Sequence, residues 1–227
     1  MGALTIILVD GVVGAGKTTL SELISERYNI PLFEELSNQD TENLLDRFYA
    51  KKTRWAFTLQ IHFLNERFRM IKDIHDAGHG ILDRSIFGDN IFAEMLAEDL
   101  EDGGEGMTWE EYRTYDTLLD NMLEHSQPPE LLIYLQCSPD VAKQRIDSRG
   151  RGLESTVEME YWERLNDKYE AWYQDYKHSP KILINVDNLD FANNKDDQES
   201  VLTLIGQALK DIGYIEEDPH LQLSMTV

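Results

Sequence analysis

The chain has 227 residues, of which 41% are hydrophobic and 10% aromatic. This composition supports a sizeable core and excludes a largely disordered chain, and the length favours one α/β domain with excursions. The 43 acidic and 21 basic residues give a formal net charge of −22. Because a field of this sign repels nucleic acid, any phosphate ligand needs a local cluster of cations.

The sequence shows neither a disulfide framework nor a targeting or membrane segment. Cys137 is the only cysteine, and one cysteine cannot form an internal disulfide. No 18 apolar residues run together, and the start lacks the basic flank and the cleavage site of a signal peptide. We therefore expect a soluble, cytoplasmic protein that binds neither nucleic acid nor membranes.

Strand and helix signals alternate along the chain. Short apolar runs predict strands at residues 4–9, 30–33, 80–82, 131–135 and 182–186. Periodicity and capping signals predict helices at 18–28, 40–50, 53–76, 86–97, 108–125, 158–176 and 199–212, another that begins at 138–140, and an acidic loop at 98–106. This alternation implies an α/β fold with a five-stranded parallel sheet and helices on both faces. One domain is expected over residues 1–212, with a polar tail at 213–227.

The segment 11–18, GVVGAGKT, matches the phosphate-loop pattern G-x-x-x-x-G-K-[ST] at every fixed position. It follows a predicted strand and opens a predicted helix, which is the context that the motif requires. Backbone N–H groups and the helix N-terminus would hold the phosphates, Lys17 would reach the β- and γ-phosphates, and the Thr18 hydroxyl would bind Mg²⁺. The expected nucleotide-binding residues are Gly11, Gly14, Ala15, Gly16, Lys17, Thr18 and Thr19.

A second tetrad, 194–197, matches the guanine-reading pattern N-K-x-D of GTPases. It follows a polar run rather than a strand, so a solvated loop is the better interpretation.

Three arginines, Arg145, Arg149 and Arg151, form the pattern R-x-x-x-R-G-R. The first two share a helix face, and Gly150 frees the chain so that Arg151 can swing. Arginines that close over phosphates would neutralise charge on the transferred phosphoryl oxygens. The alternative is a helix end whose cations complement the helix dipole.

Acidic side chains follow two of the predicted strands. Asp83-Arg84-Ser85 ends the third strand, at the sheet edge where open α/β folds bind ligands. Asp83 could hold Mg²⁺, and Arg84 could contact a phosphoryl oxygen or the acceptor site, although a plain helix cap by Ser85 is the alternative. Glu34-Glu35 ends the second strand, where a carboxylate could accept the proton of an acceptor hydroxyl.

A set of spaced residues accompanies these motifs. Tyr49 is followed by Gln60 eleven residues later and by Arg67 seven beyond that, and Asp89 follows the Asp83 segment. Glu154 follows the three arginines. From the phosphate loop to Phe191, this pattern resembles the deoxynucleoside kinases, the group that includes deoxycytidine, deoxyguanosine and deoxyadenosine kinases. The resemblance implies a P-loop kinase fold with an arginine-rich lid at about 145–157.

The resemblance also implies a role for each residue. Glu35 would be the general base on the 5′-hydroxyl, although Glu34 beside it leaves the choice between the two open. Tyr49 and Glu154 would hold the 3′-hydroxyl. The lid would consist of Arg145, Arg149 and Arg151.

The base would lie against the helix that carries Gln60 and Arg67, with Asp89 as the partner of Arg67. The seven-residue spacing puts Gln60 and Arg67 on one helix face, and a Gln amide can form two hydrogen bonds with adenine or cytosine. Phe92 could stack on the base or belong to the core.

These motifs predict an ATP- and Mg²⁺-dependent kinase that phosphorylates the 5′-hydroxyl of a deoxynucleoside. Deoxyadenosine is favoured because the chain most resembles the compact purine-preferring members, with deoxycytidine and deoxyguanosine left open. The resemblance suggests a homodimer through the helices that start near Thr53 and Thr108. The alternatives are a P-loop nucleoside monophosphate kinase and a non-catalytic nucleotide-binding regulatory module.

Overall fold

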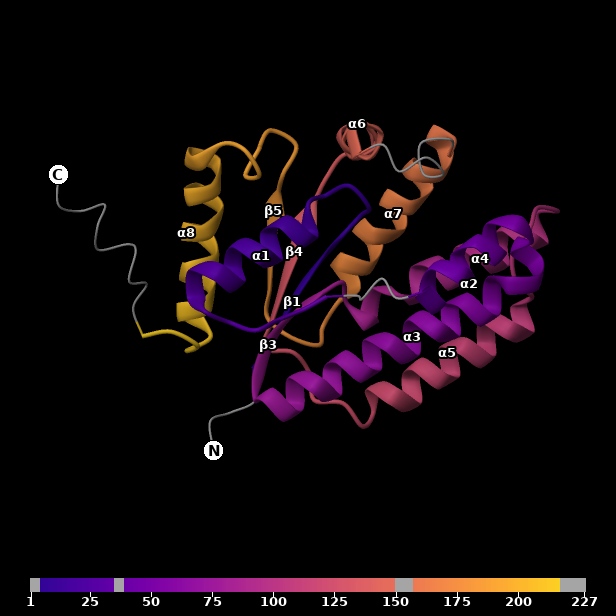
Figure 1. Cartoon of the computed structure of the whole chain (residues 1–227), viewed down its shortest axis with the longest axis horizontal. Coiled ribbons are helices and arrows are strands. Elements are labelled where there is room, and N and C mark those ends of the chain that lie inside the picture. Colours follow the sequence, from indigo (N-terminus) through magenta and orange to yellow (C-terminus); the bar gives the residue numbers. More distant parts are fainter. Residues whose placement is uncertain (1–4, 35–38, 150–156, 217–227) are drawn as a thin grey trace.

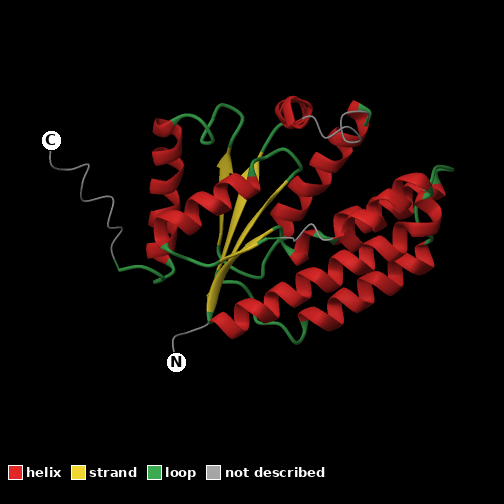
Figure 2. Cartoon of the chain, viewed as in Figure 1, coloured by secondary structure: helices red, strands yellow, loops and turns green. Residues whose placement is uncertain are grey.

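The computed structural model describes residues 5–34, 39–149 and 157–216. Its centre is a parallel sheet of five strands in the order β2-β3-β1-β4-β5 (Figures 1 and 2). The strands are β1 (Thr5–Gly11), β2 (Leu32–Phe33), β3 (His79–Asp83), β4 (Leu131–Gln136) and β5 (Lys181–Asn185). The predicted five-stranded parallel sheet is therefore confirmed.

Helices cover both faces of the sheet. In Figure 1, α1 and α8 lie on one side, and α3, α4, α5 and α7 lie on the other. The helices are α1 (Lys17–Tyr28), α2 (Gln39–Ala50), α3 (Lys52–Ala77), α4 (Asn90–Glu101), α5 (Trp109–Leu123), α6 (Pro139–Arg149), α7 (Met159–Asp175) and α8 (Lys195–Asp211). Within the described ranges, no helix is long and apolar enough to cross a bilayer.

The middle strand β1 positions the site. It pairs with β3 and β4, and Ile7 and Val9 on it are 0% exposed, as expected for a strand covered on both faces. Val9 lies opposite Asp83 in the parallel register. The loop after β1 and the loop after β3 therefore leave the sheet side by side.

The predicted helix after β3 is divided in two. A 3-10 turn, η1 (Ile86–Gly88), comes first, with the Ser85 hydroxyl accepting from the Phe87 N–H, and α4 begins only at Asn90. The helix then continues to Glu101, so the predicted acidic loop at 98–106 is wrong in its first four residues. Cations on α7 pair with acids on α4, which removes the repulsion expected in a run of acids: Lys168 with Glu94 and Glu98, and Arg164 with Asp99.

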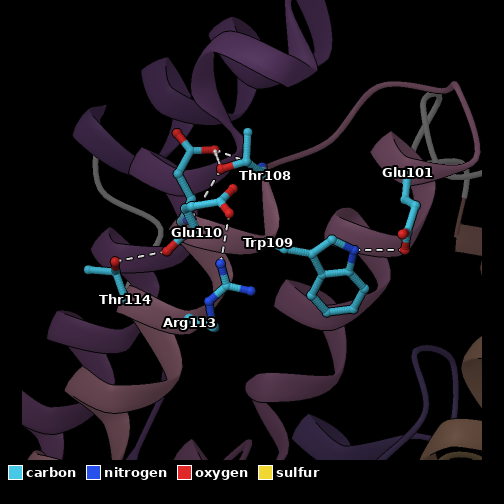
Figure 3. A network of polar contacts seen from close by, with 7 residues as sticks. Glu101, Thr108, Trp109, Glu110, Arg113 and Thr114 are labelled. Carbon is cyan, nitrogen blue, oxygen red and sulfur yellow. Dashed lines mark hydrogen bonds and ion pairs between the residues drawn. The ribbon is translucent and has the colours of Figure 1, made fainter.

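The start of α5 is fixed by its cap, as predicted. The Thr108 hydroxyl accepts from the Glu111 N–H, and the Glu111 carboxylate accepts from the Thr108 N–H. Next to the cap, the Trp109 indole N–H donates to Glu101 at 2.7 Å, which joins the start of α5 to the end of α4 (Figure 3).

The tetrad at 194–197 is not a plain loop. The Asn194 side chain accepts from the N–H groups of Asp196 and Asp197, so it caps α8, which begins at Lys195 rather than at the predicted residue 199. The polar run that suggested a solvated loop is a helix N-terminus, where Asn and Asp are favoured.

Candidate active site

The phosphate loop joins β1 to α1 and is closed around Lys17. The Lys17 ammonium donates to the carbonyl oxygens of Gly11 at 2.6 Å and of Val12 at 3.0 Å. Gly16 has a left-handed backbone (φ 98°), and no side chain caps the helix that starts behind it. Since the first turn of α1 also carries no acid, its N–H groups and dipole favour a phosphate.

Gly14 is required by a close approach of another segment. A Cβ at this position would lie 2.6 Å from the carbonyl oxygen of Ala142 on α6, and φ is 88°. The loop therefore packs directly against the helix that leads to the arginine-rich segment. Ala15 is fully buried beneath the loop.

Thr18 and Asp83 meet at the carboxyl edge of the sheet. The Thr18 hydroxyl donates to Asp83 Oδ2 at 2.6 Å, and Asp83 Oδ1 is buried with no hydrogen-bond partner among the described residues. A hydroxyl and a carboxylate oxygen are ligands that Mg²⁺ prefers, and Mg²⁺ usually completes its shell with phosphate oxygens and water. The described residues contain no group of three or more His, Cys, Asp or Glu that could hold a metal. The pair thus fits a phosphate-bound Mg²⁺ better than a metal held by protein ligands alone.

Arg84, the residue after Asp83, adopts an unusual backbone conformation. Its φ is 73°, in the left-handed region, and its N–H donates to the Val9 carbonyl. An arginine pays about 1–3 kcal/mol for a backbone of this kind, and such strain collects at functional sites. Its side chain is partly exposed at the end of β3.

Asp10 is a site residue that the sequence analysis missed. Its carboxylate is 1% exposed and accepts from the N–H of Gly11 at 2.7 Å and from the N–H of Ser85 at 3.0 Å. Burial raises its pKa, and Lys17 among its neighbours opposes that shift. The signal was present in the sequence, because an acid ends an apolar strand directly before the first glycine of the loop.

The residues predicted to lie beside the base are buried: Gln60 and Arg67 on α3, and Asp89 at the N-cap of α4. Arg67 and Asp89 form an ion pair of 2.7 Å with side-chain exposures of 6% and 7%. Gln60 is also buried and lies two turns before Arg67 on α3. The predicted Arg67–Asp89 pairing is therefore present, next to the Gln60 helix face.

Phe92 and Tyr49 occupy different environments. Phe92 is partly buried on α4 and makes an edge-to-face contact with Tyr169 of α7, with the ring centroids 6.2 Å apart. Tyr49 is 42% exposed near the end of α2. Tyr49 also contacts Phe48, with the ring centroids 5.4 Å apart, whereas Phe92 packs against the core.

Arg145 contacts backbone carbonyls around the phosphate loop. Its guanidinium donates to the carbonyl oxygens of Val186 at 2.7 Å, of Leu189 at 2.9 Å and of Ala15 at 3.4 Å. These bonds join α6, the phosphate loop and the segment after β5. Arg149 ends α6, while Arg151, Glu154 and Glu35 lie outside the described residues.

Glu34 is the described member of the acidic pair after β2. Glu34 is exposed, but partial desolvation raises its pKa, and repulsion from Asp83 and Glu22 adds to the effect. The Glu34 carboxylate is therefore close enough to Asp83 for the two negative charges to repel each other.

The comparisons with known proteins agree with this arrangement. The family model described as deoxynucleoside kinase matches residues 7–210. A deoxyguanosine kinase of Lactobacillus johnsonii is 37% identical, over 95% of this chain and 97% of that protein. A deoxyadenosine/deoxycytidine kinase of Bacillus subtilis is 35% identical, over 91% of this chain and 94% of that protein.

The comparison with solved structures also finds a deoxynucleoside kinase. The deoxyadenosine kinase of M. mycoides with bound dCTP matches with a TM-score of 0.72 and 29% identity, and the match covers 89% of this chain and 100% of that chain. The same enzyme with bound dATP also has a TM-score of 0.72. The fold, the phosphate loop and the matched relatives agree, and this chain therefore belongs to the deoxynucleoside kinase family of phosphotransferases.

Proposed function

We propose that this kinase transfers the γ-phosphoryl group of ATP to the 5′-hydroxyl of a deoxynucleoside, with deoxyadenosine preferred and deoxycytidine or deoxyguanosine as the alternatives. The observation that carries the choice of an amino-bearing base, adenine or cytosine, is the buried Arg67–Asp89 ion pair beside Gln60. A carboxylate held by arginine only accepts hydrogen bonds, so it favours the exocyclic amino group of adenine or cytosine and repels a carbonyl oxygen at the same place.

The phosphoryl donor would be held at the phosphate loop. Lys17 would exchange the carbonyl oxygens of Gly11 and Val12 for the β- and γ-phosphates, and Mg²⁺ would be bound by Thr18 and Asp83. Bound Mg²⁺ neutralises charge that develops on the phosphate oxygens. Arg149 and Arg151 would complete this neutralisation, and Arg145, through its three carbonyl contacts, would support the loop.

The acceptor would lie between β3 and the helical layer. Glu35 would take the proton from the 5′-hydroxyl, Tyr49 and Glu154 would hold the 3′-hydroxyl, and Arg84 would contact the acceptor side of the phosphoryl group. Phe92 would pack against the base on the face that Tyr169 leaves open. Acid–base assistance of this kind contributes about 10²–10⁴-fold to a rate.

The test compares four deoxynucleosides with ATP and Mg²⁺. We expect kcat/KM for deoxyadenosine and deoxycytidine to exceed that for thymidine by about 5–150-fold, the range that 1–3 kcal/mol of buried polar discrimination gives. Asp89→Asn keeps the side-chain volume and presents either a donor or an acceptor, so it should narrow this gap. Thymidine activity in the unmodified enzyme equal to that for deoxyadenosine and deoxycytidine would contradict the assignment.

A homodimer is proposed together with this activity, through α3 and α5. The two helices pack against each other, and α5 has a shallow groove on its outer side, lined by Glu110, Arg113, Thr114, Thr117, Leu118 and Asn121. A second copy related by a twofold axis would cover this face.

A further inference from the structure

Asp10 lies on β1 directly before the phosphate loop and bonds to the loop after β3, which is distant in the sequence. Its Oδ1 accepts the N–H of Gly11, the first residue of the phosphate loop. Its Oδ2 accepts the N–H of Ser85, 75 residues away in the loop after β3. One side chain therefore fixes the relative position of two backbone segments that carry different parts of the site.

The two segments serve different reactants in the proposed reaction. The phosphate loop carries Lys17 and Thr18, which face the phosphoryl donor. Asp83, the last residue of β3, and Arg84 after it would face the metal and the acceptor. The distance between donor and acceptor thus depends on how these loops sit relative to one another.

The bond to Ser85 also bears on the strained residue before it. Arg84 has φ 73°, and its N–H is already bonded to Val9 on β1. The peptide that follows Arg84 is held by Asp10. A left-handed arginine persists only where its surroundings fix it, and here both flanking N–H groups are fixed to β1, one by a backbone carbonyl and the other by the Asp10 carboxylate.

The chain leaves room for this carboxylate at Gly88. A Cβ at Gly88 would lie 2.9 Å from Asp10 Oδ2, and the nearest atom outside Asp10 would be 3.9 Å away, on Trp172. Gly88 does not have a positive φ. The contact with Asp10, and not the backbone conformation, therefore limits the size of a side chain at this position.

A buried acid is costly for folding. Burial raises the pKa of Asp10 although Lys17, the Gly11 and Ser85 N–H groups and Arg67 all oppose the shift. The surrounding tyrosines Tyr134, Tyr169 and Tyr176 supply no positive charge. An apolar side chain would be easier to bury in this position, but it could not accept two N–H groups from two loops.

We propose that Asp10 is a positioning residue for phosphoryl transfer, which sets the donor loop against the acceptor loop through its bonds to Gly11 and Ser85. The inference rests on the proposed function for the division of work between the loops. It requires that Asp10 acts through the backbone, because its carboxylate is 1% exposed.

The first test replaces Asp10 by Asn, which keeps the shape but can accept only one of the two N–H groups. The nucleotide contacts of the phosphate loop and the base contacts of α3 and α4 stay in place, so KM for both substrates should change by less than about threefold. The kcat should fall by about 10²-fold, the cost of a misplacement near 1 Å. The matched control is Glu130→Gln, because Glu130 also accepts an N–H of β1, that of Ile6, but at the opposite end of the strand.

The second test perturbs the same contact from the other side. Gly88→Ala should displace the Asp10 carboxylate and lower kcat in the unmodified chain. In an Asp10→Ala background, the carboxylate that Gly88→Ala would displace is absent, so Gly88→Ala should lower kcat no further. The effects of the two changes on kcat are then not additive, and a double-mutant cycle measures this coupling. Gly88→Ala alone, which keeps Asp10, remains informative if the Asp10 variants fold poorly.

Three outcomes would overturn the inference. One is a kcat loss in Asp10→Asn no greater than in Glu130→Gln, and another is a rise in KM with unchanged kcat. The third is additive losses for Asp10→Ala and Gly88→Ala. An unmodified enzyme that phosphorylates no deoxynucleoside would instead contradict the proposed function, so the two failures are distinguishable.

Discussion

Lys17, Thr18 and Asp83 bring a cation, a hydroxyl and a carboxylate to one edge of the sheet through contacts of 2.6–3.0 Å. Each is held by the backbone or by another member of the group, so little conformational freedom remains to be lost when phosphates bind. Pre-organised charge of this kind is the main resource that a protein has for phosphoryl transfer.

Single substitutions of the two neighbouring acids after β2 test the proposal that Glu35 is the general base. Glu35→Gln keeps the shape and removes the proton acceptor, so kcat should fall by about 10²–10⁴-fold while deoxynucleoside binding changes little. Steady-state kinetics and equilibrium binding measure the two quantities separately.

Glu34→Gln is the matched control for this change. Its carboxylate is repelled by Asp83 and Glu22, so removing its charge should leave kcat within about threefold, as expected for a group outside the proton transfer. Near-normal kcat in Glu35→Gln together with a large loss in Glu34→Gln would move the base to Glu34.

At the scale of elements, α7 holds α4 and the turn before it, next to the residues proposed to contact the base. Lys168 bonds to Glu94 at 2.8 Å and to Glu98 at 2.7 Å, and the Trp172 indole N–H donates to the Phe87 carbonyl at 2.8 Å. One helix thus anchors both α4 and the 3-10 turn before it. Burial opposes the charge of Lys168, but its two carboxylate partners raise its pKa overall.

Lys168→Met should destabilise the protein through α4. The change leaves Glu94 and Glu98 facing each other, and partly exposed pairs are worth about 0.2–1 kcal/mol each. We therefore expect Tm to fall by about 1–8 °C, as measured by calorimetry at low salt, with a smaller fall at high salt because like charges are screened.

Lys210→Met is the control for this prediction. Lys210 is exposed in the last turn of α8, which lies on the other side of the sheet from α4 and α7 (Figure 1). Its removal should change stability by no more than about 0.5 kcal/mol. Equal Tm shifts in the two variants would show that α7 does not anchor α4 through Lys168.

At the scale of the whole molecule, a net charge of −22 opposes association. A dimer therefore needs a face with few unpaired acids and some apolar surface. The outer side of α5 offers Leu118 and two threonines, Thr114 and Thr117, with the acid Glu110 already paired with Arg113.

Leu118→Glu should dissociate the proposed homodimer. A twofold axis places the new charge near its copy, and loss of about 2 kcal/mol at a central contact raises the dissociation constant by about 30-fold. Light scattering over a range of concentrations measures the shift. Leu204→Glu introduces the same charge at a 48% exposed leucine on α8, on the other side of the sheet, and should leave the dimer unchanged.

A monomer at all concentrations in the unmodified chain would reject the α5 interface. Dissociation by Leu204→Glu and not by Leu118→Glu would move the interface to α8.

The sequence alone determined the elements whose signals are local. The phosphate loop needs only consecutive residues between a strand and a helix, and Thr108 and Glu111 form their capping box within one turn. The Arg67–Asp89 pair was predicted from the resemblance to the deoxynucleoside kinases and is present in the structure, whereas the seven-residue spacing alone gave only the shared helix face of Gln60 and Arg67. Short apolar runs predicted the five strands, and their alternation with helices predicted the parallel direction.

The contacts between segments that are far apart in the sequence were visible only in the tertiary structure. Pairing with Lys168 and Arg164 of α7 extended α4 through a run of acids that resembled a loop. Arg145 was predicted only for the lid, yet it is held by carbonyl groups from two other segments. Asp10 was overlooked because its importance comes from Ser85, 75 residues away. Local patterns fix conformation, but the hydrogen bonds and ion pairs that join the loops depend on the three-dimensional packing of the sheet.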